Sequence, residues 1–111
     1  MKEKIISKGL PASSGVATGN IKIITKIKEL YKVKSGDILI VKTSNPAWTI
    51  GMTKASGIIS ELGGIISHAA IVAREMGMPC IVSVENATTI FKDGQKIKID
   101  GNKGVIYEQW R

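Results

Sequence analysis

The single histidine of the sequence, His68, lies in a setting that suits a phosphate group. It follows the pair Gly63-Gly64, which gives the backbone freedom to approach another molecule closely. Ser67 then predicts the start of a helix, so free backbone N–H groups and the positive end of the helix dipole gather beside the imidazole. The pattern indicates a place where a phosphate could be bonded to, or could approach, a ring nitrogen.

The chemistry of imidazole fits this interpretation. Its ordinary pKa near ~6.5 leaves a neutral, nucleophilic fraction at neutral pH. Plainer explanations exist, because a lone histidine is often a surface residue or a hydrogen-bonded core residue. His68 has no cysteines spaced as further zinc ligands, so no metal site is predicted. An adjacent Ser-His pair is not a hydrolase dyad either, and on the residues alone the phosphate site ranks below the plainer explanations.

Short β-branched runs separated by turn residues predict the strands that must position this site. The predicted strands are residues 21–25, 37–42, 57–60, 80–84 and 96–100. A turn at 100–102 predicts a hairpin with residues 105–107.

Two helices are delimited by their end residues. Asn45 before Pro46 predicts an N-cap and a helix over 46–55. Ser67 predicts the cap of a helix over 68–76, which Gly77 ends. A weaker helical turn is predicted at 86–91. Strands with interspersed helices predict an α/β class with a mixed sheet and a few short helices.

Size and composition predict one domain over residues 1–111 with an ordinary hydrophobic core. Cys80 is the single cysteine, which excludes an internal disulfide and points to a reducing cytoplasm. No apolar run approaches the roughly 20 residues that span a bilayer. Residues 1–10 also lack the apolar stretch of a signal peptide, so neither secretion nor a membrane partner is expected.

The net charge of +7 comes mostly from lysines, five of which lie within residues 22–34. Such a surface could attract nucleic acid, nucleotide phosphates or an acidic protein. A solvated surface is the plainer explanation. The sequence holds only two Trp, two Tyr and one Phe, too few for a row of base-stacking aromatics, so nucleic-acid binding is a minor alternative.

The run GGIISHAAIVAREMGMP at residues 63–79 resembles the phosphohistidine signature of the phosphoenolpyruvate-utilising enzymes, which include pyruvate phosphate dikinase and phosphoenolpyruvate synthase. Three further blocks are similar to that family in the same order, at residues 9–19, 43–49 and 100–105. The resemblance extends over nearly the whole chain, and four ordered blocks make coincidence a poor explanation.

The resemblance implies a swivelling β/β/α domain in which His68 is transiently phosphorylated. It places Gly63, Gly64, Ser67 and Ala69 around the phosphate. The phosphoryl group would move between a nucleotide (ATP) site and a pyruvate/phosphoenolpyruvate or other acceptor site. Those sites would lie on an ATP-binding domain and a phosphoenolpyruvate- or pyruvate-binding domain, or on separate proteins. The chain would bind no cofactor, Mg and ATP would belong to the partners, and it would form part of a phosphotransferase without being a complete enzyme.

One position departs from the family pattern. Ile66 stands where the family commonly has threonine, and in some dikinases that threonine takes a regulatory phosphorylation. Regulation of that kind is therefore not expected here.

Arg74 and Trp48 are weaker candidates for docking. Arg74 follows His68 by six residues, which puts it roughly opposite His68 around a helix. It is predicted to bridge to a partner or to pair with Glu61 or Glu75. Trp48 fits either the core or a docking surface.

The alternative function is a swivelling-fold interaction or anion-binding module without transfer chemistry. The intact Ser67-His68-Ala69-Ala70 run favours transfer. The initial methionine and the end of the chain soon after the last predicted strand favour a free-standing carrier, with an excised domain of a larger enzyme as the other reading. Both ATP and phosphoenolpyruvate remain candidate donors.

Overall fold

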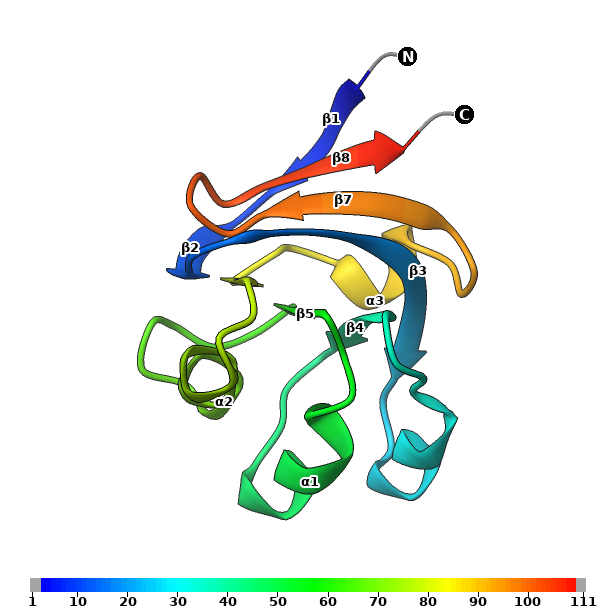
Figure 1. Ribbon diagram of the computed structural model, residues 1–111, viewed down its shortest axis with the longest axis vertical. Coiled ribbons are helices and arrows are strands. Elements are labelled where there is room, and N and C mark those ends of the chain that lie inside the picture. Colours follow the sequence, from blue (N-terminus) through cyan, green and yellow to red (C-terminus); the bar gives the residue numbers. More distant parts are fainter. Residues whose placement is uncertain (1–2, 110–111) are drawn as a thin grey trace.

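The computed structural model describes residues 3–109 and arranges them as two sheets, with most of the helical segments packed on one side (Figure 1). The predicted domain, residues 1–111, includes two residues at each end that lie outside the described part. The strand order is β1-β8-β7-β3-β4-β5-β6-β2. The strands are β1 (Glu3–Lys8), β2 (Leu10–Ser13), β3 (Val16–Ile24), β4 (Ile38–Val41), β5 (Gly57–Ser60), β6 (Cys80–Val82), β7 (Lys96–Asp100) and β8 (Val105–Gln109).

Strand β3 belongs to both sheets. Its first residues pair antiparallel with β7, and its last residues pair parallel with β4. One sheet, which contains β1, β8, β7 and the first half of β3, is therefore antiparallel. The other is parallel through β3, β4, β5 and β6, with β2 antiparallel at its edge. Near the change of partner, Gly19 passes so close to Gly36 that a Cβ would overlap the Gly36 carbonyl oxygen.

The two outermost strands are consecutive in the chain and are separated only by Gly9. Because β1 pairs with β8 and β2 pairs with β6, one extended segment borders both sheets. The N–H of Gly9 donates to the carbonyl of Gly104 at 2.9 Å. A Cβ at Gly9 would lie 2.5 Å from the carbonyl oxygen of Val82, so this crossing requires glycine.

Alternate residues of β4 serve two hydrophobic cores. Leu39 and Val41 pack with the helix layer, whereas Ile38 and Ile40 pack between the sheets. Successive side chains of a strand point to opposite faces, and all four are buried because the parallel sheet is covered on both sides. The buried strand predicted at 37–42 is confirmed.

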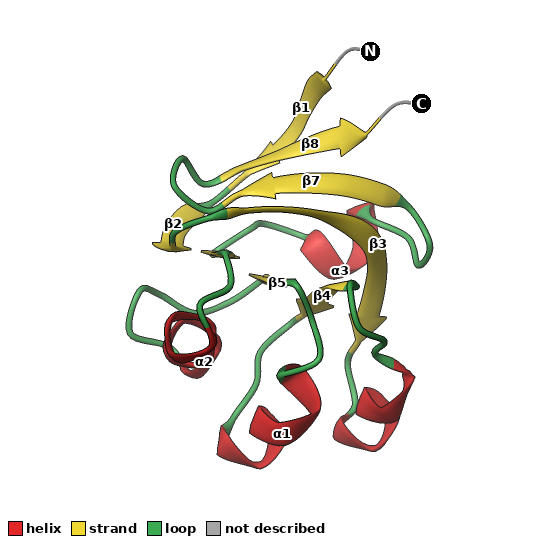
Figure 2. Cartoon of the chain, in the orientation of Figure 1, coloured by secondary structure: helices red, strands yellow, loops and turns green. Residues whose placement is uncertain are grey.

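The helical segments on the outer face of the parallel sheet are η1 (Ile27–Lys32), η2 (Pro46–Trp48), α1 (Thr49–Met52) and α2 (His68–Met76), with η marking 3₁₀ helix (Figure 2). Helix α3 (Ala87–Ile90) lies on the other face, between the sheets. Helix α2 packs against β2, β5 and β6, while α3 adds Ala87 to the core between the sheets. The α/β class with a mixed sheet and a few short helices is confirmed. No helix within residues 3–109 is long and apolar enough to cross a membrane.

Some element boundaries differ from the predictions. The sequence patterns do not predict β1, β2 or the first half of β3, where Gly19 and Asn20 disfavour a strand and pairing with β7 overrides them. Strand β6 ends at Val82 because Ser83 adopts a positive φ of 57°. The helix predicted at 46–55 is split into η2 and α1 and ends at Met52, because the chain must then turn into β5.

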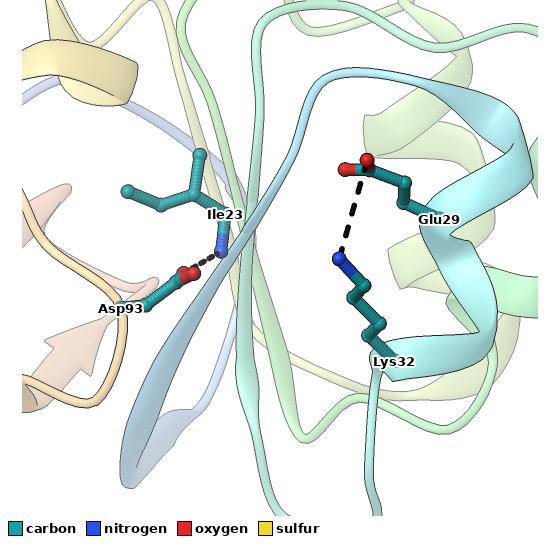
Figure 3. A network of polar contacts seen from close by, with 4 residues as sticks. All are labelled: Ile23, Glu29, Lys32 and Asp93. Carbon is teal, nitrogen blue, oxygen red and sulfur yellow. Dashed lines mark hydrogen bonds and ion pairs between the residues drawn. The ribbon is translucent and has the colours of Figure 1, made fainter.

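The lysine-rich stretch at 22–34 lies mainly at the surface, with four of its five lysines exposed. Within η1, Nζ of Lys32 lies 4.0 Å from Oε2 of Glu29, a surface pair worth at most about 1 kcal/mol (Figure 3). Nearby, the N–H of Ile23 donates to Oδ1 of Asp93 at 2.6 Å and ties β3 to the turn before β7. This arrangement fits the solvated-surface explanation.

Candidate functional site

Two loops from neighbouring parallel strands meet at His68. Carboxyl ends of parallel strands lie at the same edge of a sheet. Strand β4 leads into the loop that carries Ser44, and β5 leads into residues 61–67 and the start of α2. The pairing of β4 with β5 therefore brings residues about twenty positions apart in the chain to one place.

His68 is the first residue of α2, as predicted. Ser67 precedes it in an extended conformation, with φ −71° and ψ 165°, and its carbonyl accepts the N–H of Ile71 at 3.0 Å. The N–H groups of residues 68–70 come before this first helical hydrogen bond and are left without an acceptor in the helix. Donors and the positive end of the dipole therefore collect beside the imidazole.

Hydroxyl groups contact both ring nitrogens of His68. Oγ of Ser44 lies 2.8 Å from Nδ1, and Oγ1 of Thr49, the first residue of α1, lies 2.9 Å from Nε2. A neutral imidazole has one N–H and one lone pair, and a hydroxyl can serve either. One hydroxyl therefore accepts from the ring while the other donates to it, and together they fix the plane of the ring.

Partial burial also affects the charge of His68. The side chain is half-buried, and loss of hydration lowers the pKa of the imidazole below its usual 6.5. Both of its hydrogen-bond partners are uncharged hydroxyls. The neutral ring, which has the lone pair needed for nucleophilic attack, is thus the favoured form at neutral pH.

The predicted serine cap is only partly correct. Ser67 occupies the N-cap position, but its hydroxyl makes no capping hydrogen bond. Within residues 3–109, Oγ of Ser67 is a buried polar atom without a partner. It packs close to Gly63, where an added Cβ would lie 3.0 Å from that oxygen. A spare hydroxyl therefore lies at the residue before His68.

The glycine pair has two different roles. Gly63 has a φ of +101° and passes close over Ser67, so it needs both the conformational freedom and the small size of glycine. Gly64 has open space where a Cβ would be, and its carbonyl accepts the N–H of Ser67 at 3.0 Å. Ala69 is 2% exposed and packs in the core, so only its backbone faces the helix end.

The pairing predicted for Arg74 is wrong. Its guanidinium donates to the carbonyls of Ala12 and Ile65, each at 2.7 Å, rather than to a carboxylate. Glu61 instead accepts the N–H and the hydroxyl of Thr88, which lower the pKa of that carboxyl. Arg74 therefore ties β2 and the loop before His68 to α2. It also lines a pocket of about 500 Å³ whose lining does not include His68.

Of the two possibilities considered for Trp48, core or docking surface, the structure favours the core. The Trp48 side chain is 8% exposed and belongs to the core beneath the helix layer. Ile66, in contrast, is 85% exposed. The isoleucine at position 66 therefore does not deprive the imidazole of hydroxyl partners, because Ser44 and Thr49 supply them.

Ser44 and Thr49 are the site residues that sequence reasoning missed. Both belong to the block at 43–49, in which the sequence predicts the Asn45 cap. That cap is confirmed, since Oδ1 of Asn45 accepts the N–H of Ala47 at 3.0 Å. The sequence does hold a sign of them: Ser44 and Thr49 flank the Asn45-Pro46 turn, which follows the buried strand β4.

The other titratable groups of residues 3–109 form neither a metal site nor a reactive thiol. Within residues 3–109, no group of three or more His, Cys, Asp or Glu residues is placed to hold a metal ion. Cys80 lies in β6, where burial raises the pKa of its thiol to about 12, so it stays protonated.

The family with the description "PEP-utilising enzyme, mobile domain" matches residues 33–104, which include Ser44, Thr49 and His68. The chain belongs to this family. The resemblance stated from the four blocks is thereby confirmed, and so is the assignment of a swivelling phosphohistidine carrier domain at the level of family and fold.

Curated relatives of this mobile domain are much longer proteins. The probable phosphoenolpyruvate synthase of Methanothermobacter thermautotrophicus is 50% identical over 105 residues, which cover 95% of this chain and 15% of the relative. The rifampicin phosphotransferase of Bacillus cereus is 42% identical over 98 residues, which cover 88% of this chain and 11% of the relative. The chain thus spans about one seventh or less of the length of these relatives.

Solved structures support the fold of the mobile domain. An Enzyme I structure determined by NMR has a TM-score of 0.61 and 29% identity, covering 70% of this chain and 32% of that chain. An aconitase X of Thermococcus kodakaraensis has a TM-score of 0.73 at 16% identity, covering 99% of this chain and all of that chain. The second likeness shows the fold alone.

Proposed function

We propose that His68 carries a phosphoryl group between two catalytic sites that lie outside this chain. The observation that carries the proposal is an imidazole at a helix N-terminus whose two ring nitrogens are held by the hydroxyls of Ser44 and Thr49, in a mobile domain of phosphoenolpyruvate-utilising enzymes. The lowered pKa of His68 supports it, because a neutral ring is ready to attack.

The transfer needs only one nitrogen lone pair. That pair attacks the phosphorus of the donor, and an N–P bond forms as the P–O bond to the donor breaks. The bonding electrons leave with the donor oxygen, while the second ring nitrogen keeps its proton and its N–H donates a hydrogen bond to a hydroxyl. Transfer to the acceptor reverses these steps with an acceptor oxygen as nucleophile.

The chain offers donors to the incoming phosphoryl oxygens. The hydroxyl displaced from the attacking nitrogen, from Ser44 or Thr49, can donate to one of them. Backbone N–H groups of residues 68–70 and the spare hydroxyl of Ser67 lie at the same helix end. Gly64 and Ala69 contribute through their backbone. Charge-assisted hydrogen bonds of this kind are about twice as strong as neutral ones.

The remaining machinery belongs to partners in this proposal. The names of the relatives, phosphoenolpyruvate synthase and rifampicin phosphotransferase, motivate an ATP-binding partner domain and a second domain for pyruvate/phosphoenolpyruvate or another acceptor. We place ATP and Mg on those partners. The chain would then act as one part of a phosphotransferase.

The test is labelling of the purified chain with a transferable radioactive phosphate. ATP or phosphoenolpyruvate would be supplied together with partner proteins from the same source. We expect acid-labile label on the wild type and none on His68→Ala, whose fold is checked by circular dichroism. Label that persists on His68→Ala would overturn the site. Absence of label with every donor and partner would favour the interaction-module alternative.

A further inference from the structure

Large apolar side chains are exposed around His68 to an unusual degree. Ile50 and Ile66 are each 85% exposed, the highest values among the large hydrophobic residues of the described part of the chain. Ile71 is 42% exposed. We refer to Ile50, Ile66 and Ile71 as the apolar collar. Exposed apolar side chains that gather in one place mark interaction sites more often than chance exposure does.

Each residue of the collar is close in the chain to His68 or to its hydrogen-bond partner Thr49. Ile50 follows Thr49, whose hydroxyl bonds Nε2 of His68 at 2.9 Å. Ile71 lies three residues after His68 on α2, which places it on the same helix face. Ile66 lies two residues before His68. Arg74 fixes this last segment through the carbonyl of Ile65 at 2.7 Å.

The described chain leaves the collar uncovered. The first and last described strands pair with each other, with Glu3 opposite Gln109. They run out on the side of the molecule away from α1 and α2 (Figure 1). A partner can therefore reach the collar and His68 together.

Building on the proposed function, we infer that the apolar collar is the docking surface for a catalytic domain of the phosphoenolpyruvate synthase type that phosphorylates His68. These side chains are exposed and close in sequence to His68 or to its partner Thr49, so a catalytic domain that brings a phosphorus atom to the imidazole would contact them. Their contact with the partner excludes water from the transfer, which strengthens the hydrogen bonds at the phosphate and prevents its hydrolysis.

The absence of charge on the three isoleucines suits a carrier in particular. The partner has to bind His68 as a neutral imidazole and release it with a negatively charged phosphoryl group. An apolar rim contributes about equally to both states, so neither is trapped. Recognition would then rest on shape and buried apolar area, and the mouth of the partner site should carry apolar side chains around its phosphate-binding groups.

Two phosphoryl donors distinguish an effect on partner docking from an effect on the reactivity of His68. Phosphoramidate, a small donor, reaches His68 without any protein contact. The protein donor is the Methanothermobacter phosphoenolpyruvate synthase with the segment that matches this chain deleted, supplied with ATP, Mg and phosphoenolpyruvate. The variants are Ile50→Ser, Ile66→Ser and the double variant. Ile5→Ser is the matched control, because Ile5 is also exposed, at 49%, but lies on β1 in the other sheet.

We expect all variants to accept phosphate from phosphoramidate at the wild-type rate. With the protein donor, the apparent KM for the double variant should rise on the order of tenfold or more, with kcat little changed, and Ile5→Ser should match the wild type. An unchanged KM in the double variant, or a wild-type chain that takes phosphate from phosphoramidate but not from this donor, would overturn the docking surface. Failure of phosphoramidate to label the wild type at His68 would overturn the proposed function instead.

Discussion

At the scale of the residue, two hydroxyls control the imidazole of His68. Ser44 and Thr49 hold Nδ1 and Nε2 at 2.8 and 2.9 Å, so the ring meets a donor in one orientation. Positioning of this kind matters more for transfer than for stability, because a half-buried ring that loses a hydroxyl partner can be solvated by water. The two hydroxyls are therefore best tested by their effect on rate.

Removal of either hydroxyl should slow phosphorylation of His68. We expect Ser44→Ala and Thr49→Val each to lower the rate roughly two- to tenfold, which corresponds to a lost hydrogen bond of about 0.5–1.5 kcal/mol. The measurement is the single-turnover rate with phosphoramidate, combined with ¹⁵N shifts of the ring that report its tautomer. Thr53→Val is the control, because Oγ1 of Thr53 bonds the carbonyl of Ile50. Equal rates in all of these proteins would contradict the assignment.

The protonation of His68 gives a second prediction. Burial lowers its pKa below 6.5, so the folded chain binds fewer protons than the unfolded chain as pH falls through that value. Phosphorylation should be independent of pH above about 7 and should fall in acid with an apparent pKa below 6.5, because the imidazolium has no lone pair. Because the unfolded chain binds the proton more readily, the contribution of His68 to the unfolding free energy is present above pH 6.5 and is lost as pH falls through the lowered pKa. A ring titration followed by NMR with its midpoint above 6.5 would be inconsistent with this account.

Sequence reasoning found the reactive residue and missed its partners. His68 could be predicted because its glycines, helix start and family signature lie within one continuous segment. Ser44 and Thr49 lie 24 and 19 positions away in the chain, and only the pairing of β4 with β5 brings them to the ring. For Arg74, opposite charge predicts a bridge to a partner or a pairing with Glu61 or Glu75, but its guanidinium donates to two backbone carbonyls that the fold brings near it.

At the scale of the element, the loop between β5 and α2 positions His68 through one of its two glycines. Gly63 combines a φ of +101° with a contact in which a Cβ would lie 2.9 Å from Cβ of Ser67. Gly64 has neither constraint. The loop therefore requires glycine at position 63 but not at position 64, although the sequence shows the same residue at both.

The two alanine variants of this pair should differ in stability. Gly63→Ala should lower the unfolding free energy by about 1–3 kcal/mol, because an alanine at positive φ is strained and would push against Ser67. Gly64→Ala should change it by less than about 1 kcal/mol, since it restricts only the unfolded chain. Urea denaturation provides the comparison. A Gly63→Ala protein as stable as Gly64→Ala would show that the loop does not depend on this conformation.

Elements with a clear local pattern could be predicted, and elements formed by distant pairing could not. Residues 37–42 show the apolar run of a doubly covered strand, and residues 96–100 show the alternation of a half-covered one, as β4 and β7 confirm. Strands β1 and β2 lack such a pattern because they border the sheets. Their pairing with β8 and β6 across most of the sequence decides their structure.

At the scale of the whole molecule, the segment from β1 through β2, which borders both sheets, also supports the site. The parallel sheet contributes one face to the core between the sheets and the other to the core under α1 and α2. The segment from β1 through β2 borders both sheets, and the carbonyl of Ala12 in β2 receives Arg74 from α2. Local damage at the crossing should therefore spread to both sheets.

This crossing gives the last prediction. In Gly9→Ala the new Cβ would lie 2.5 Å from the carbonyl oxygen of Val82 and 2.6 Å from Cγ2 of Val84. We expect a loss of about 1–3 kcal/mol in unfolding free energy, typical of overpacking in a close contact. Hydrogen exchange should show weaker protection in both β8 and β6, because each pairs with one half of the segment that Gly9 joins. Gly64→Ala again provides the control, since open space surrounds that position. Loss of protection in β8 with β6 unchanged would mean that the two sheets unfold independently and that the segment does not couple them.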